Sequence, residues 1–245
     1  MTTSTVPDAY LGVWKRTLLR TPDFEDTTSE VYWLQTSRWH GDIRVRTDRP
    51  ALADRGSLAA CARDELLALA KHQGFCGVTT VEGDVCRWHR RVDFQPPSGF
   101  NDVGRMVFES PDRSLEYGIE QDYFEIWERL PQSIGPTMAV TRDDAGRAVH
   151  LLRTGHCVMR IRPRAQTLPP AANLAALAVD CDDATLRDWL DFEISFARLD
   201  DDGSATILRS TFPWLEGQRL PEAEVLQAAA DGGLGPAARH WRVLD

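Results

Sequence analysis

Two arginines lie two residues apart in the segment "GDIRVR", and this spacing suits the binding of an anion. In a strand, Ile43 and Val45 share one face, while Asp42, Arg44 and Arg46 share the opposite face. Two guanidinium groups on one face can hold a carboxylate or phosphate through paired hydrogen bonds. A solvated outer face explains the same pattern, so the sequence leaves a ligand clamp and a plain surface row as alternatives.

A second candidate group lies in the segment "YLGVWKRTLL" near the amino terminus. Alternation puts Trp14 and Arg16 on one face of the predicted strand. If that face points inward, Arg16 requires a carboxylate, carbonyl or aromatic partner. It then either contacts a ligand or stacks near Trp14 and closes the floor of a barrel. Trp33 and Gln35 alternate on the next strand and are expected to line the same pocket, unless Trp33 is ordinary core.

Motifs for known catalytic chemistry are missing from the sequence. It has no Gly-x-Ser-x-Gly, no Gly-x-x-x-x-Gly-Lys and no His-Glu-x-x-His. A buried pair of carboxylates could perform acid/base chemistry, but surface positions explain the acidic residues of this region equally simply. These residues are Glu109, Glu116, Glu120 and Glu125. The spacing of Cys and His residues matches no zinc site, so we expect no metal and no cofactor, and we favour a protein without enzyme activity over an enzyme.

Composition narrows the choice of partner and compartment. The net charge of -9 disfavours nucleic-acid binding, which depends on clustered Lys and Arg. No apolar run approaches the ~20 residues that cross a bilayer, so no membrane span is expected. The amino terminus lacks the basic and apolar regions of a secretion signal, and the five cysteines form no paired framework. These features predict a cytoplasmic protein.

Short β-branched and aromatic segments bounded by Gly, Pro, Asp and Asn indicate antiparallel strands. Helices are a minority and are predicted over 57–73, 182–190 and 221–230. The predicted strands cover about 10–20, 29–36, 41–47, 74–81, 85–94, 103–109, 114–119, 122–130, 137–143, 147–154, 157–163, 191–199, 204–212 and 238–244.

An internal repeat organises these elements into two halves. The segment 123–129 resembles 10–16, and Arg160-Ile161-Arg162 matches Arg44-Val45-Arg46. In each half, strands are followed by a helical segment and then by a hairpin. We therefore predict an all-β fold with minor helices, made of two tandem antiparallel barrels related by duplication. The expected domains are 1–121 and 122–245.

The segments "YLGVWKRTLL", "VYWLQT", "GDIRVR", "DVGRMVFE" and "YFEIWERL" resemble a family that includes a yeast protein reported to interact with a casein-type kinase, together with uncharacterised bacterial relatives. The resemblance implies a pair of calycin-like β-barrels, related to lipocalins and fatty-acid-binding proteins, with no established enzymatic activity. The kinase contact belongs to the fungal protein and is not carried over.

Three functions fit these observations. The first is binding of a small apolar or amphipathic ligand in a barrel pocket, through Trp14, Arg16, Trp33, Gln35, Arg44 and Arg46. The second is a protein-interaction scaffold with barrels filled by side chains, in which the loops 48–56 and 163–173 contact the partner. The third is a cofactor-free isomerase or cyclase, which requires a buried carboxylate or His in a cavity.

Overall fold

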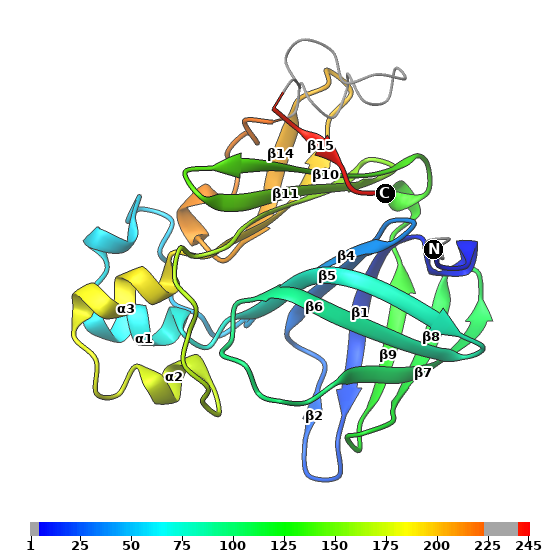
Figure 1. The fold of residues 1–245 in the computed structure, drawn as a ribbon, viewed down its shortest axis with the longest axis horizontal. Helices are drawn as coiled ribbons and strands as arrows, with labels where there is room; N and C mark the ends of the chain where they lie inside the picture. Colours follow the sequence, from blue (N-terminus) through cyan, green and yellow to red (C-terminus); the bar gives the residue numbers. More distant parts are fainter. Residues whose placement is uncertain (1–4, 223–239) are drawn as a thin grey trace.

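The first half of the chain forms a closed antiparallel β-barrel (Figure 1). The computed structural model describes residues 5–222 and 240–245. Each barrel strand pairs with the next, and the last strand pairs with the first. The short strand β2 (Glu25–Asp26) extends the sheet beside the end of β1. The eight barrel strands are β1 (Gly12–Arg20), β3 (Glu30–Gln35), β4 (Trp39–Val45), β5 (Gln73–Glu82), β6 (Val85–Asp93), β7 (Asp102–Ser110), β8 (Arg113–Gly118) and β9 (Phe124–Arg129).

Strand β9 corrects the predicted domain boundary. The segment 122–130 was expected to open a second domain, but β9 pairs with both β8 and β1 and completes the first barrel. The barrel therefore extends to residue 129, and a boundary at residue 121 would cut through it. The likeness between 123–129 and 10–16 reflects two neighbouring strands of one barrel that both point a Trp inward.

The second sheet contains six strands in the order β14-β13-β12-β11-β10-β15. Among the described residues its two outer strands, β14 and β15, do not pair with each other, so the expected second barrel is not seen. The strands are β10 (Thr137–Asp144), β11 (Arg147–Thr154), β12 (Cys157–Arg162), β13 (Glu193–Leu199), β14 (Ala205–Ser210) and β15 (Arg242–Val243).

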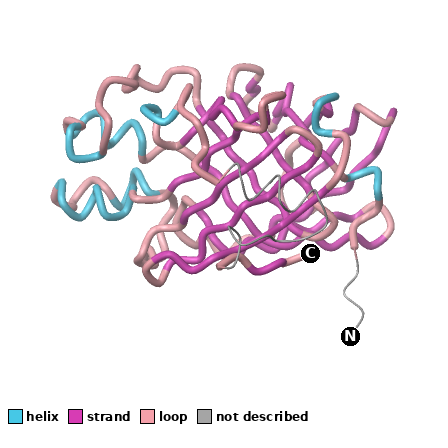
Figure 2. The backbone as a smooth tube through the Cα atoms, turned by 90° about the horizontal axis from the view of Figure 1, so that it is seen from above, coloured by secondary structure: helices cyan, strands magenta, loops and turns pink. Residues whose placement is uncertain are grey.

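Three helices lie together beside the two sheets (Figure 2). They are α1 (Arg63–Leu69), α2 (Leu174–Leu177) and α3 (Asp183–Leu190). The prediction for α3 is confirmed, with the Asp182 carboxylate accepting a hydrogen bond from the Thr185 amide at its start. The predicted helix 57–73 is too long, because its chain is extended at Cys61 and Ala62 and enters β5 at Gln73. From residue 223 on, the predicted helix 221–230 lies outside the described residues.

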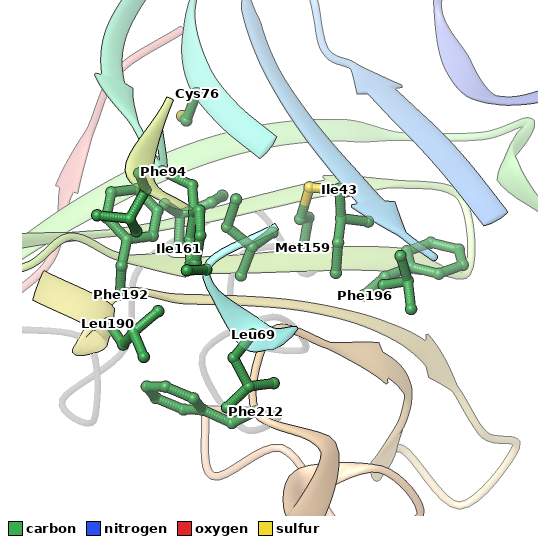
Figure 3. Packing of buried hydrophobic residues seen from close by; sticks show 14 of the residues in the cluster. Ile43, Leu69, Cys76, Phe94, Met159, Ile161, Leu190, Phe192, Phe196 and Phe212 are labelled. Carbon is green, nitrogen blue, oxygen red and sulfur yellow. The ribbon is translucent and has the colours of Figure 1, made fainter. Parts of the chain in front are cut away.

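The outer surface of the barrel packs on the second sheet. Ile43 of β4 points away from the barrel interior into a shared apolar core with Met159 and Ile161 of β12 (Figure 3). Tyr32 of β3 stacks on Phe196 of β13 with ring centroids 4.7 Å apart. The barrel wall is thus buried on both faces along β3 and β4, and the largest apolar core lies between the two sheets.

Bulges and glycine let the sheet curve into a barrel. The pairing of β5 with β6 shifts by one residue between Cys76 and Gly77. A Cβ atom at Gly77 would lie 2.0 Å from the carbonyl oxygen of His89, so only glycine fits there. Similar shifts occur between Arg16 and Leu18 and near Phe108.

We expect Leu152→Ala to destabilise the protein by about 2–5 kcal/mol, because Leu152 is fully buried in the core between the sheets and its removal leaves a cavity. Urea unfolding measures the effect. Val179→Ala is the control, because Val179 is 69% exposed and its truncation should change stability by less than about 0.5 kcal/mol. Equal unfolding midpoints for the two variants would contradict this account of the interface.

Candidate functional site

The barrel encloses a cavity of about 210 Å³. Its mouth lies where β1 ends and β9 begins, near Thr21, Gln121 and Tyr123. At the mouth, it adjoins a larger cleft of about 1200 Å³ on the outside of the barrel. Five residues line both spaces: Arg44, Arg90, Asp102, Gln121 and Tyr123. A molecule entering from the cleft would therefore reach the cavity directly.

Aromatic side chains form much of the cavity wall. Trp33, Phe75, Trp88 and Trp127 come from four different strands and all line the cavity. The Trp33 ring meets Trp88 and Trp127 edge to face, with centroids 5.4 and 5.9 Å apart. These contacts fix the ring orientations, because edge-to-face packing is a favoured geometry for aromatic pairs. This part of the cavity wall is therefore apolar.

Arg16 joins three strands by buried ion pairs. Its guanidinium group donates to Asp26 of β2 at 2.9 Å and to Glu125 of β9 at 2.8 Å. All three side chains are at most 8% exposed. The Asp26 carboxylate also accepts bonds from the amides of Thr28 and Ser29. Although burial opposes ionisation, these hydrogen bonds hold the pKa of Asp26 well below its usual value.

Two further arginines lie at the cavity mouth, and carboxylates already bind both. Arg44 donates twice to Asp42, at 2.8 and 3.4 Å. Arg90 donates to Asp102 at 2.6 Å and to Asp93 at 2.8 Å. The ring of Phe75 lies against both guanidinium groups, 3.6 Å from Arg90 and 5.4 Å from Arg44.

Glu116 is a buried carboxylate without a cationic partner. It accepts hydrogen bonds from the Tyr123 hydroxyl at 2.6 Å and from the Trp127 indole at 2.9 Å. Among the described residues, no Lys, Arg or His forms a salt bridge with it. Glu125 lies directly opposite on β9. Burial, followed by the negative charge of Glu125, raises the pKa of Glu116 well above its usual value.

A glycine on the neighbouring strand makes room for Glu116. A Cβ atom at Gly104 of β7 would lie 2.8 Å from one carboxylate oxygen of Glu116 and 2.9 Å from its Cγ. Burial also raises the pKa of Glu125, against the opposing effects of Arg44 and Arg16. Glu116 and Glu125 therefore form an adjacent pair of carboxyl groups that hold protons more strongly than exposed ones.

Of the six residues predicted for the site, two line the cavity. Trp33 forms part of the aromatic wall and Arg44 lies at the mouth. Arg16 does not line the cavity, but it forms an ion pair with Glu125, which does. The other two inward-facing residues, Trp14 and Gln35, are fully buried and do not line the cavity.

Trp14 packs away from the cavity and donates its indole N–H to the carbonyl of Tyr10 at 2.8 Å. Arg16 does not stack on it. Instead, the Arg129 guanidinium lies 5.2 Å from the Trp14 ring. Gln35 accepts a hydrogen bond from the Thr79 hydroxyl at 2.6 Å. Both predicted residues thus have structural partners.

Arg44 and Arg46 do not form a joint clamp. Although they share a face of the sequence pattern, Arg46 follows the end of β4, is exposed and pairs with Asp48 at 2.7 Å. Arg46 lines only the outer cleft, whereas Arg44 lines both the cleft and the cavity and donates to Asp42. Because the strand ends at Val45, alternation no longer predicts the direction of the next side chain.

Several cavity residues were missed in the sequence. Trp88 and Arg90 occupy alternate positions in "CRWHR", the same signal that singled out Trp33 and Gln35. Of the four glutamates considered for acid/base chemistry, Glu116 and Glu125 are buried, and Glu109 and Glu120 are exposed. The pairing of β8 with β9 brings the buried two together.

The outer cleft is lined by the segment 163–173 and by the rim of the barrel. Arg164 fastens this segment to the rim by donating to the carbonyls of Asp93 and Phe94. Burial lowers the pKa of Arg164 to about 10. Lys71 and Arg91 also line the cleft, and neither forms a salt bridge with the described part of the chain.

Within residues 5–222 and 240–245, no three His, Cys, Asp or Glu side chains are grouped so as to hold a metal ion. No helix in the same ranges has the length and apolar character to cross a membrane. All five cysteines are free thiols.

These features define a closed eight-stranded antiparallel barrel that has an internal cavity and packs on a second sheet. The fold is similar to that in the crystal structure of the uncharacterized protein YLR301w from Saccharomyces cerevisiae. The TM-score is 0.55, with 10% sequence identity over 81% of this chain and 84% of the yeast chain. At this identity the likeness concerns the fold. No protein-family description matches the sequence. No curated protein matches it significantly.

We expect Arg16→Met to destabilise the protein by about 3–5 kcal/mol, because it leaves the buried carboxylates of Asp26 and Glu125 without their cation. Arg20→Met on the same strand is the control. Arg20 and Glu25 are both more than half exposed, so losing their pair should cost less than about 1 kcal/mol. Chemical unfolding of the two variants gives the comparison, and similar losses would show that burial does not govern these pairs.

We expect Glu116→Gln to make the protein relatively more stable as the pH rises. In the wild-type chain, the unfolded state loses the Glu116 proton near its usual pKa of 4.5, whereas the folded state keeps it to higher pH. Wild-type stability therefore falls as the pH rises from that value through the folded pKa, by up to ~1.4 kcal/mol per pH unit. The amide cannot ionise, so the variant lacks this loss.

Unfolding free energies of the wild-type protein and Glu116→Gln, measured from about pH 5 to pH 8, test this expectation. Glu109→Gln is the matched control, because Glu109 is exposed and pairs with Arg113 at the surface. A constant difference between Glu116→Gln and the wild-type protein across this range would contradict a raised pKa for Glu116.

Proposed function

We propose that this protein binds a small amphipathic molecule in the barrel cavity. The observation that supports this function is a space of about 210 Å³ with aromatic walls, open at one end to a cleft. An engineered apolar cavity of ~150 Å³ can hold benzene, so the volume here suits a group slightly larger than one ring. Ligand sites of other proteins combine apolar walls with a few placed polar groups in the same way.

The amphipathic character of the ligand follows from the two kinds of lining. Trp33, Trp88 and Trp127 offer apolar surface. Asp42, Glu116 and the arginines at the mouth offer hydrogen-bonding and charged groups. A purely apolar ligand would leave these polar groups facing it without compensation, which is costly in a buried site. A molecule with both an apolar and a polar part satisfies both.

We further propose that the two sheets derive from duplicated calycin-like barrels. We also propose that the protein is cytoplasmic. The order of two strands, a helical segment and a hairpin occurs in β3–β6 and again in β11–β14, which supports duplication. Arg44 and Arg160 lie at matched places and each pairs with a carboxylate, Asp42 and Glu193 respectively. Five unpaired thiols are compatible with a reducing compartment.

A cofactor-free isomerase or cyclase is a second candidate. The observation that favours it is the adjacent pair Glu116 and Glu125, buried beside the cavity with raised pKa values. Such a pair can accept and donate protons to a bound molecule. An interaction scaffold would instead use the outer cleft, where the segment 163–173 lies. Chemical change of a bound molecule distinguishes the enzyme from the binding protein.

We expect native mass spectrometry of the gently purified full-length protein to show a discrete added mass that disappears on denaturation. Thr21→Phe should abolish the added mass, because Thr21 lines the cavity near its mouth and a phenyl ring there blocks entry. Thr27→Phe is the matched control, since Thr27 is exposed and does not line the cavity. A bound mass that survives Thr21→Phe would place the ligand elsewhere and contradict the proposal.

A further inference from the structure

The charges lining the cavity are not balanced. Four carboxyl groups, those of Asp42, Asp102, Glu116 and Glu125, face two guanidinium groups, those of Arg44 and Arg90. Arg44 and Arg90 each form an ion pair with an aspartate. Glu125 forms an ion pair with Arg16. Glu116 is left with two neutral hydrogen-bond donors and no cation. An uncompensated buried carboxylate is costly, so it either keeps a proton or attracts a positive charge.

The walls around Glu116 suit a positive charge. Trp127 donates to Glu116 and lines the cavity beside it, and Trp33 packs against Trp127. The faces of indole rings carry negative potential and attract cations, most strongly when water is excluded. Trp88 completes this aromatic surface against Trp33. Clusters of aromatic side chains are the arrangement by which proteins recognise alkylated ammonium groups, and here the Glu116 carboxylate lies beside such a cluster.

We propose that the cavity binds the positively charged end of an organic cation, a protonated or quaternary amine, with Glu116 as its counter-ion and the three indoles as its apolar contacts. This inference rests on the proposed ligand-binding function and specifies the chemical class of the ligand. The volume of about 210 Å³ fits a substituted ammonium group, and the rest of the molecule extends through the mouth into the outer cleft.

An anionic head group fits the cavity less well. To bind one, Arg44 would have to release Asp42, and Arg90 would have to release Asp93 or Asp102. The released aspartates would then lie unpaired beside the anion, and Glu116 would repel it. A cation requires none of these bonds to break.

Binding of a cation is coupled to proton release. The titratable and charged groups that face or influence Glu116 are Glu125 on β9, Asp102 on β7, Arg44 on β4, Cys86 on β6, and Tyr123 and Tyr10 outside the strands. Burial and the nearby acidic groups favour the protonated form of Glu116, whereas an ammonium group favours the ionised form. A cation therefore displaces the proton, and its affinity rises with pH.

Three probes of the same branched shape test the charge preference on the full-length protein. Choline carries a permanent positive charge, 3,3-dimethylbutanol is its neutral counterpart, and 3,3-dimethylbutanoate is negative. Titration calorimetry should show choline binding about tenfold or more tightly than the alcohol, with the carboxylate weakest. Repeating the choline titration in buffers of different ionisation enthalpy should reveal proton release.

Two substitutions test whether Glu116 is responsible for the preference for choline. Glu116→Gln should remove most of the advantage of choline over the alcohol and abolish the proton release, whereas Glu109→Gln, an exposed position, should change neither. If Glu116→Gln does not fold, the pH dependence of choline binding to the wild-type protein gives the same information. Affinity that is constant with pH would then contradict the role of Glu116.

The outcomes separate this inference from the proposed function. Equal or tighter binding of the alcohol or the carboxylate would overturn the preference for a cation and leave a ligand-binding cavity. Failure of all three probes to bind would also overturn it, while the bound mass seen by native mass spectrometry, and its loss in Thr21→Phe, decides the proposed function independently.

Discussion

The pairing of β1 with β9 is the interaction on which the interior depends. It joins residues more than a hundred positions apart, such as Trp14 with Arg129 and Arg20 with Phe124, and removes both free edges of the sheet. Closure of the sheet buries the ionisable groups Arg16, Glu116 and Glu125. Arg16 lies at this seam and binds Glu125 across it, so closure is secured by an ion pair in addition to the backbone hydrogen bonds. Because the effective dielectric constant is lower inside the protein than in water, charges in the interior interact more strongly with one another than surface charges do.

The interior combines aromatic rings packed edge to face with ionisable groups. A barrel of this size is commonly filled by apolar side chains or left just wide enough for a small molecule. Here Trp14, Met106 and Phe108 fill the end away from the mouth, while the mouth end keeps space among Asp42, Arg44 and Glu116. Retaining charged groups in such a place is costly, and ion pairs with arginines offset that cost for Asp42, Asp102 and Glu125 but not for Glu116.

Much of the fold was predictable because strand positions depend on local alternation and turn residues. The strands predicted at 85–94, 147–154 and 157–163 agree closely with β6, β11 and β12. Strand pairing was less predictable, because a strand that closes a barrel has the same pattern as one that opens a new sheet. The segment 122–130 was misplaced for this reason.

The site was partly predictable for a related reason. Trp33 and Arg44 were found because they share the inward face of their strands. Glu116 and Glu125 were identified as acidic residues of neighbouring strands, yet their types favoured the surface. Their burial depends on which face of β8 and β9 turns inward and on the space above Gly104, both of which are set by distant parts of the chain.

Strand β4 has a consequence for how this protein can change in length. Asp42 and Arg44 face the cavity, while Ile43 and Val45 face the core between the sheets. Inserting or deleting one residue within 39–45 would exchange the two sets, placing charges in the apolar core and aliphatic groups in the cavity. The connection at 46–57 lies outside the strands and has no alternating faces to exchange, but Leu52 within it is buried in the core and Arg49 donates to Ser210 and Glu216. A change in chain length should therefore be less disruptive at the exposed residues 53–54 and 56–57 of that connection than in the strand beside it.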